Sequence, residues 1–173
     1  MTPFFITGLP RSRTAWLAVV STTGNSICHH EPGFGDYESA RDIWQAPSEV
    51  RVGISDAGLG LHIRRIVDDI APRVLIVDRD LEAVLASFER YAGMDLAGSR
   101  DAVRDRLWDL RDALEFDHPL IRRVRFEDLT SQSVVTDCMA WLGVTPLNLP
   151  QLMHLNIQSD LGFNLAKLRA QAA

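Results

Sequence analysis

The sequence predicts an α/β domain in which helices flank a central, mainly parallel sheet in three layers. Two apolar runs, at residues 4–6 and 74–77, have the length and composition of strands that are buried on both faces. Segments with apolar residues at helical spacing follow, at 81–88 and 103–114, and the connections are short. Because strands that alternate with helices usually pair in parallel, we expect one domain over residues 1–173.

Three strands and three helices are expected before residue 73. They are a strand at 4–6, a helix from 14 to about 22, a strand from 26, a short helix at 37–44, a strand at 50–54 and a helix that buries Ile63, Ile66, Val67 and Ile70. Gly24 and Asn25 end the first helix, since both residue types favour the turn that terminates helices. Residues 55–58 form a loop suited to cap the helix that follows.

The second half begins with the clearest strand of the chain. Residues 74–77 are four consecutive apolar residues between Arg73 and Asp78, and the run ends abruptly in charge, which predicts a central strand. The elements expected after it are a helix up to Gly93, an amphipathic helix with Val103, Leu107, Leu110 and Leu114 on one face, a strand at about 121–126 and a helix around Cys138, Trp141 and Leu142.

Composition restricts the classes of function. The chain has 173 residues, of which 46% are hydrophobic and 24% charged, as in folded globular domains. A formal charge of −5 argues against broad nucleic-acid binding. The absence of an apolar run of about 18 residues and of a signal-peptide pattern predicts a cytoplasmic protein with no membrane association. Cys28 and Cys138 follow neither zinc-site nor disulfide spacing, and we expect both to be buried.

Residues 4–17 join an apolar strand, a polar turn and the first turn of a helix. A loop that leads into a helix directs unpaired backbone N–H groups at one spot, where the helix dipole favours an anion. The side chains that add donors for phosphate or sulfate oxygens are Arg11, Ser12, Arg13 and Thr14. The loop departs from a Walker A motif, because Arg13 and Thr14 stand at its second Gly and its Lys, and Lys167 is the only lysine.

The loop resembles the 5′-phosphosulfate loop of the sulfotransferase family, usually Pro-Lys/Arg-Ser-Gly-Thr-Thr-Trp. The matching residues are Pro10, Arg11, Ser12, Thr14 and Trp16. The resemblance implies a P-loop-type fold and a small, divergent, bacterial-type member that binds 3′-phosphoadenosine 5′-phosphosulfate (PAPS) through Arg11, Ser12, Arg13, Thr14 and Trp16. Arg13 replaces a Gly, and its bulk is expected to narrow the site. The alternative is an ordinary strand–turn–helix with solvated arginines.

A second segment is similar to the part of sulfotransferases that holds the 3′-phosphate of PAPS. In the family, an Arg just after a strand is followed eight residues later by a Ser, and Arg79 and Ser87 have this spacing. The resemblance implies that both bind the cofactor. The alternative is that Arg79 forms an ion pair with Asp78, Asp80 or Glu82. In that case Ser87 is simply a small exposed residue of the helix.

The end of the chain resembles the family less completely. Residues 124–129 look like the strand and Tyr/Phe-Glu-Asp-Leu turn of many members, a mostly architectural piece. Residues 161–169 lack the Arg-Lys-Gly segment that closes over the 3′-phosphate in many sulfotransferases. This departure implies weakened cofactor binding or lost activity, and the resemblance spans about residues 4–141.

Sulfuryl transfer needs a base for the acceptor proton and a cation for the leaving phosphate. Arg11 suits the cationic role. Glu31 is the favoured base, because several branches of the family place a Glu just after the second strand. His29 and His30 are the alternatives, and strand alternation puts His29 and Glu31 on one face. These residues can instead simply bound a Pro/Gly turn.

Three functions follow from these residues. The leading hypothesis is a sulfotransferase-like enzyme that moves a sulfuryl group from PAPS to a hydroxyl or amine without a metal. The second is a Mg²⁺-dependent kinase or hydrolase with Asp78 as metal ligand, against which the missing loop lysine counts. The third is a non-catalytic module that binds a nucleotide or a phosphorylated partner. The sequence leaves the acceptor, any partner and the oligomeric state open.

Overall fold

The computed structural model describes residues 1–33, 35–92 and 100–155, which form an α/β fold around a five-stranded sheet. The strands are β1 (Phe4–Gly8), β2 (Ser26–His30), β3 (Arg51–Ser55), β4 (Arg73–Asp78) and β5 (Ile121–Arg125). Their order is β2-β3-β1-β4-β5, and every pairing is parallel. The predicted parallel sheet is therefore confirmed. β4 is an interior strand as expected, but β1 rather than β4 takes the central position.

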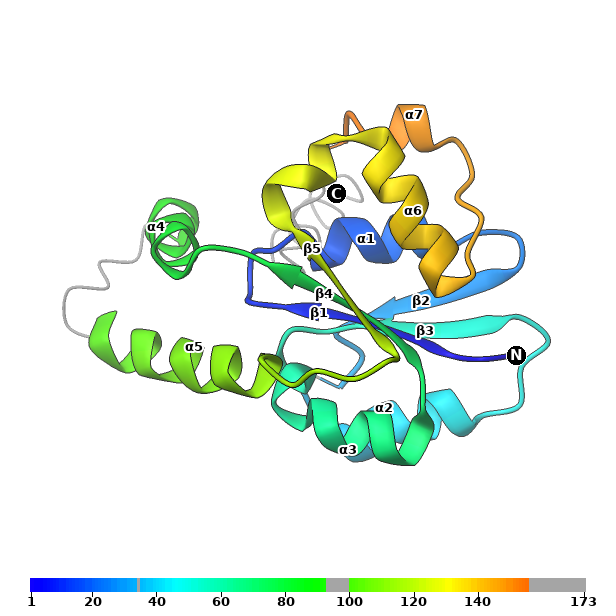
Figure 1. Cartoon of the computed structure of the whole chain (residues 1–173), viewed down its shortest axis with the longest axis horizontal. Helices are drawn as coiled ribbons and strands as arrows, with labels where there is room; N and C mark the ends of the chain where they lie inside the picture. Colours follow the sequence, from blue (N-terminus) through cyan, green and yellow to red (C-terminus); the bar gives the residue numbers. More distant parts are fainter. Residues whose placement is uncertain (34, 93–99, 156–173) are drawn as a thin grey trace, which may run out of the picture.

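Helices cover both faces of the sheet (Figure 1). On one face lie α1 (Thr14–Ser21), α6 (Gln132–Leu142) and α7 (Leu149–Leu152), and on the other α2 (Tyr37–Gln45) and α3 (Ile63–Ile70). The helices α4 (Leu81–Ala92) and α5 (Arg100–Leu114) extend beyond the carboxyl ends of the strands. Two 3₁₀ helices, η1 (Gly58–His62) and η3 (Phe126–Thr130), follow β3 and β5. The arrangement has three layers.

Strand alternation divides the buried side chains into two cores. Phe4 and Ile6 pack toward α1 and α6, whereas Phe5 packs toward α2 and α3. All three side chains are 0% exposed, since helices exclude water from both faces of the central strand. Removing apolar surface from water stabilises a fold by roughly 25 cal/mol per Å². Because β1 is buried on both faces, this gain explains why residues 4–6 are all apolar and do not alternate with polar ones.

The predicted elements correspond closely to the observed ones. The main additions are η1, which precedes α3, and the short helix α7. The loop at 55–58 was predicted to cap the helix with Ile63, but it leads into η1, where Asp56 Oδ1 accepts a hydrogen bond from Leu59 N at 3.0 Å. The first helix ends at Ser21, before the predicted Gly24 and Asn25. Gly93, the predicted end of α4, and the tail at 161–169 lie outside the described residues. None of the described helices combines the length and the apolar character that crossing a membrane requires.

The two cysteines behave as predicted. Cys28 and Cys138 are buried and free. Burial raises the pKa of both thiols, so they stay protonated and act as small apolar side chains.

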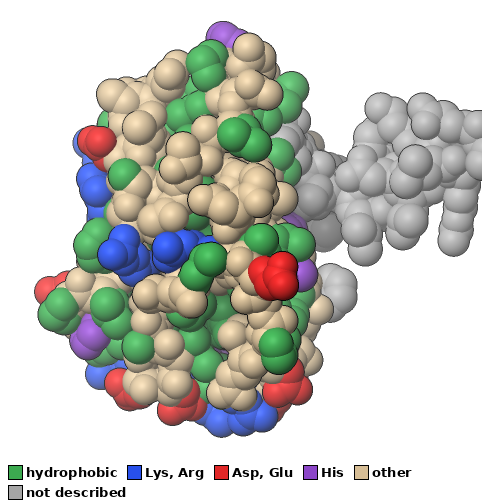
Figure 2. Space-filling view, turned by 90° about the vertical axis from the view of Figure 1, so that its right-hand side faces the viewer, with side chains coloured by type: hydrophobic (Ala, Val, Ile, Leu, Met, Phe, Trp, Pro, Cys, Tyr) green, Lys and Arg blue, Asp and Glu red, His purple; other side chains and the backbone are tan. Residues whose placement is uncertain are grey.

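The face at which the strands begin carries scattered charges (Figure 2). Arg51 and Arg73, the first residues of β3 and β4, both donate hydrogen bonds to backbone carbonyls. Arg51 Nη1 donates to Thr2 O at 2.7 Å, and Arg73 Nη1 donates to Trp141 O at 2.7 Å. These guanidinium groups therefore hold chain segments together at this edge of the sheet.

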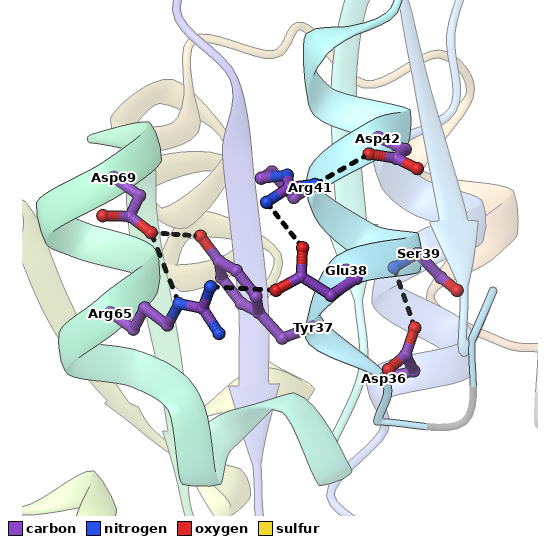
Figure 3. A network of polar contacts seen from close by, with 8 residues as sticks. All are labelled: Asp36, Tyr37, Glu38, Ser39, Arg41, Asp42, Arg65 and Asp69. Carbon is purple, nitrogen blue, oxygen red and sulfur yellow. Dashed lines mark hydrogen bonds and ion pairs between the residues drawn. The ribbon is translucent and has the colours of Figure 1, made fainter.

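A polar network joins α2 to α3 on the outer layer (Figure 3). Tyr37 Oη donates to Asp69 Oδ2 at 2.6 Å, and Arg65 Nη2 donates to Glu38 Oε1 at 2.8 Å. The Arg65 guanidinium also lies 3.8 Å from the centre of the Tyr37 ring. Each contact links the two helices, so the network fixes the outer layer and contributes no side chain to the loop after β1.

Candidate functional site

The loop between β1 and α1 has an unusual backbone. Arg11 and Arg13 have φ angles of 68° and 61°, in the left-handed region that residues other than glycine seldom occupy. Arg13 is the N-cap residue of α1, and its side chain makes no capping hydrogen bond. The Arg13 side chain therefore does not occupy the first backbone N–H groups of α1. An anion site at a helix N-terminus requires such uncapped N–H groups.

Ser12 lies in this loop and is fully buried. Ser12 is 0% exposed, and its Oγ has no hydrogen-bond partner within the described part of the chain. An unsatisfied buried hydroxyl costs about 1–3 kcal/mol, so such groups usually serve a ligand or water. Thr14 is 6% exposed and accepts a hydrogen bond at its carbonyl from Ser55 Oγ at 2.8 Å, which ties the start of α1 to β3. The loop is thus held rigidly while one hydroxyl remains available.

The structure brings Arg79 and Ser87 to the same loop. β4 lies beside β1, with Val77 opposite Gly8, so that Arg79 emerges next to the loop. Arg79 Nη1 donates a hydrogen bond to Arg11 O. Arg11 Nε in turn donates to Ser87 Oγ at 3.3 Å. The two segments that the sequence singled out separately therefore form one continuous hydrogen-bonded group.

Positive charge is concentrated around Arg79. Partial burial lowers the pKa of its guanidinium, and the nearby charge of Arg11 lowers it further. Arg90 and Arg13 act in the same direction, and the carboxylate of Glu127 opposes them. Guanidinium groups this close together repel one another, and a bound anion would relieve that repulsion. The electrostatics therefore fit a phosphate or sulfate ligand.

The Arg13 side chain points to a neighbouring turn. Its Nη1 donates to Leu129 O at 3.1 Å, and its guanidinium lies 5.5 Å from the ring centres of both Trp16 and Phe126. The left-handed backbone accommodates the residue that replaces the family's Gly, and the guanidinium anchors the loop to η3. Its expected narrowing of the anion position, and its binding of the cofactor, stay predictions.

Trp16 is part of the core of the described fold. It is 2% exposed, and its Nε1 donates to Leu152 O in α7 at 2.8 Å. The indole N–H is thus used within the chain, which fixes α1 against the C-terminal layer. A contact between Trp16 and a cofactor stays a prediction.

Glu31, His29 and His30 lie at the carboxyl end of the edge strand β2. β3 separates β2 from β1, so at about 4.8 Å per strand Glu31 stands roughly 10 Å from the end of β1. Glu31 lies beyond the last residue of β2 and has a φ of 46°. The strand alternation that put His29 and Glu31 on one face therefore does not extend to Glu31. Instead, His30 Nε2 lies 3.9 Å from Glu31 Oε1.

Asp78 is the Mg²⁺ ligand expected under the kinase or hydrolase hypothesis, and it forms an ion pair in the structure. Its Oδ1 accepts a hydrogen bond from Arg123 Nη1 at 2.7 Å. Burial raises the pKa of the Asp78 carboxyl, and Arg123 opposes this shift. Within residues 1–33, 35–92 and 100–155, no three His, Cys, Asp or Glu side chains gather as metal ligands. The donor set around Asp78 favours a structural ion pair over a Mg²⁺ site.

A pocket of about 460 Å³ opens beside Arg79. It lies at the carboxyl ends of β4 and β5 and reaches Leu9 in the loop after β1. Its charged lining residues are Asp78, Arg79, Asp80, Arg111, Glu115, Arg123, Arg125 and Glu127. Open parallel sheets commonly bind ligands at this edge. The β5 and α5 side chains of this pocket could not be identified from the sequence, because only the fold places them next to Arg79.

Asp56 is a further buried polar residue at this edge, and it follows β3. It is 1% exposed, and its two carboxylate oxygens accept hydrogen bonds from Gly35 N at 3.2 Å and from Leu59 N at 3.0 Å. Because both oxygens are occupied by backbone donors, the carboxylate holds the loops after β2 and β3 in place beside the loop after β1.

Comparison with known proteins finds a similarity of fold. No family model and no curated protein sequence matches the chain. Among solved structures, the fold is similar to that of mouse sulfotransferase SULT7A1 complexed with PAP, with a TM-score of 0.63 and 14% sequence identity. The match covers 88% of this chain and 63% of the mouse chain, so the protein spans less than two thirds of that structure. The likeness shows the fold, a P-loop-type α/β domain as predicted.

Proposed function

We propose that the protein is a sulfotransferase-like enzyme that moves a sulfuryl group from PAPS to a hydroxyl or amine acceptor. The observation that carries the proposal is the joining of two predicted phosphate-binding segments, through the hydrogen bonds of Arg79 to Arg11 O and of Arg11 to Ser87 Oγ. Agreement in space between two motifs that are 76 residues apart is far more specific than either motif alone.

Each residue has a role that fits its surroundings. The start of α1, Ser12 Oγ and Arg11 would hold the 5′-phosphosulfate, since they offer uncapped N–H groups, an unsatisfied hydroxyl and a cation. Arg79 and Ser87 would hold the 3′-phosphate. PAPS supplies the sulfuryl group, which passes to the acceptor oxygen or nitrogen as its bond to the phosphate oxygen breaks. The Arg11 guanidinium would stabilise the negative charge left on that phosphate.

Glu31 is the proposed base that takes the acceptor proton. Its distance of about 10 Å from the end of β1 leaves room for an acceptor between the carboxylate and the loop. A second candidate function is a nucleotide-binding module without turnover, because Arg13 replaces the loop Gly of sulfotransferases and residues 161–169 lack the Arg-Lys-Gly segment.

The proposal is tested by ligand-induced stabilisation. Adenosine 3′,5′-bisphosphate should raise the melting temperature without Mg²⁺, and AMP, which lacks the 3′-phosphate, should raise it much less. A lost charge-assisted contact is worth roughly 1.5–3 kcal/mol, or on the order of tenfold to a hundredfold in affinity. Arg79→Ala should erase the difference between the two ligands, whereas Arg51→Ala, at the opposite edge of the sheet, should preserve it.

A kinase or hydrolase gives a different pattern. It would respond to ATP with Mg²⁺ and be indifferent to the 3′ position. Stabilisation by Mg²⁺–ATP with none by the bisphosphate would refute the sulfotransferase proposal.

A further inference from the structure

Four side chains lie close together beside the loop after β1, and they come from three segments: the start of α1, the residue after β4 and the turn after β5. The guanidinium carbon of Arg13 lies 5.5 Å from the ring centres of both Trp16 and Phe126. The same Phe126 ring holds a second guanidinium, that of Arg79, whose central carbon lies 3.9 Å from the ring centre. Phe126 is the first residue of η3, so this turn contacts both the loop and the residue after β4.

The Phe126 ring offsets part of the unfavourable environment of the positive charge on Arg79. Partial burial and the charges of Arg11 and Arg13 all lower the pKa of Arg79, which means that the site disfavours its positive charge. The negative face of an aromatic ring attracts a guanidinium without neutralising it. A carboxylate in the same place would compete with an anionic ligand, whereas a phenyl ring does not.

The contact also restricts where Arg79 can point. Arg79 Nη1 donates to Arg11 O while the planar guanidinium rests on the Phe126 ring. A flexible side chain held at both places loses less conformational entropy when it binds a ligand. The ring thus prepares Arg79 for binding before any ligand arrives.

We propose that Phe126 is a positioning residue that holds the Arg79 guanidinium in place for the 3′-phosphate. This inference rests on the proposed function, because Arg79 needs a phosphate to bind. It adds a role that the resemblance did not assign, since residues 124–129 resembled a mostly architectural piece of the family.

The test compares two phenylalanines in matched settings. Phe126→Met removes the ring and keeps most of the volume, and Phe116→Met is the control, because Phe116 is also partly buried and lies 4.8 Å below the guanidinium of Arg64. Calorimetry should show that Phe126→Met weakens adenosine 3′,5′-bisphosphate binding about threefold to thirtyfold. AMP binding should change less than about twofold, and Phe116→Met should alter neither affinity.

A second set of substitutions separates the effect of the negative ring face from the effect of side-chain packing. Fluorinated phenylalanines at position 126 keep the shape of the ring while making its face progressively less negative, so bisphosphate affinity should fall stepwise with fluorine content. Phe126→Tyr, which retains an electron-rich face, should bind the bisphosphate within about twofold of the natural protein.

The outcomes separate this inference from the proposed function. If the natural protein does not bind the bisphosphate, the proposed function fails and the inference fails with it. If the natural protein binds but fluorination has no effect, or Phe126→Met weakens AMP as much as the bisphosphate, only the positioning role is overturned.

Discussion

At the scale of single residues, Ser12 should separate ligand binding from stability. Its buried Oγ has no partner in the described chain, so Ser12→Ala should leave the free energy of unfolding unchanged or raise it by up to about 1 kcal/mol. The same change should weaken adenosine 3′,5′-bisphosphate binding roughly tenfold or more, because a hydrogen bond to a charged ligand oxygen is lost. Urea unfolding and calorimetry measure the two quantities.

Ser21 provides the control. It is also 0% exposed, but its Oγ donates to Leu17 O at 2.7 Å. Ser21→Ala should therefore destabilise the fold by about 1 kcal/mol and leave ligand affinity intact. If Ser12→Ala behaves like Ser21→Ala, then Ser12 has no ligand to bind.

Glu31→Gln tests the proposed base. The substitution keeps the size of the side chain and removes its capacity to accept a proton, so turnover should fall by about 10²–10⁴ while bisphosphate affinity stays nearly constant. Release of adenosine 3′,5′-bisphosphate from PAPS, followed with a panel of hydroxyl and amine acceptors, measures the effect. Full activity in this variant would move the role to His29 or His30, whereas a natural protein that binds without turnover would support the binding module.

At the scale of elements, the α2–α3 network predicts a contribution to stability that is separate from the site. Tyr37→Phe removes the hydrogen bond to Asp69 and should lower the free energy of unfolding by about 1–2 kcal/mol at neutral pH. Asp42→Asn is the control, since Asp42 is highly exposed and its contact with Arg41 is 3.4 Å long, so it should cost less than about 0.5 kcal/mol. Neither variant should change bisphosphate affinity.

The contribution of Tyr37 to the free energy of unfolding should depend on pH. Burial raises its pKa, and the hydrogen bond to Asp69 raises it further. The folded state therefore retains the phenol proton more tightly than the unfolded chain, whose tyrosine titrates near pH 10. The stability that Tyr37 adds is fully present below about pH 10 and declines above it, so urea unfolding of the natural protein and of Tyr37→Phe should converge as the pH rises. A constant difference between them up to pH 11 would contradict this assignment.

At the scale of the whole molecule, the strand order arranges the site. Glu31 follows β2, the loop with Arg11 follows β1, and Arg79 follows β4. In the order β2-β3-β1-β4-β5, the loop thus lies between the proposed base and the proposed 3′-phosphate site. This placement would separate the acceptor from the nucleotide on the two sides of the loop.

Local pattern was enough to predict most elements. Apolar runs and helical spacing depend only on neighbours in the chain, which explains why the bounds of β1, α1 and α3 were close to those observed. The spacing of Arg79 and Ser87 was also visible in the sequence. Pattern does not determine strand order, however, so the central position went to β4 in the prediction and belongs to β1 in the fold.

The sequence by itself determined the parallel α/β architecture and the loop after β1, because these features depend on periodicity and residue chemistry. The pair of Arg79 and Ser87 was identified in the sequence through its resemblance to the sulfotransferase family. Only the tertiary structure decided that Arg79 contacts Arg11, that Arg13 turns to η3 and that Phe126 lies against both Arg13 and Arg79. These contacts join segments that are distant in the chain, and their partners are set by sheet order and packing, which no local pattern encodes.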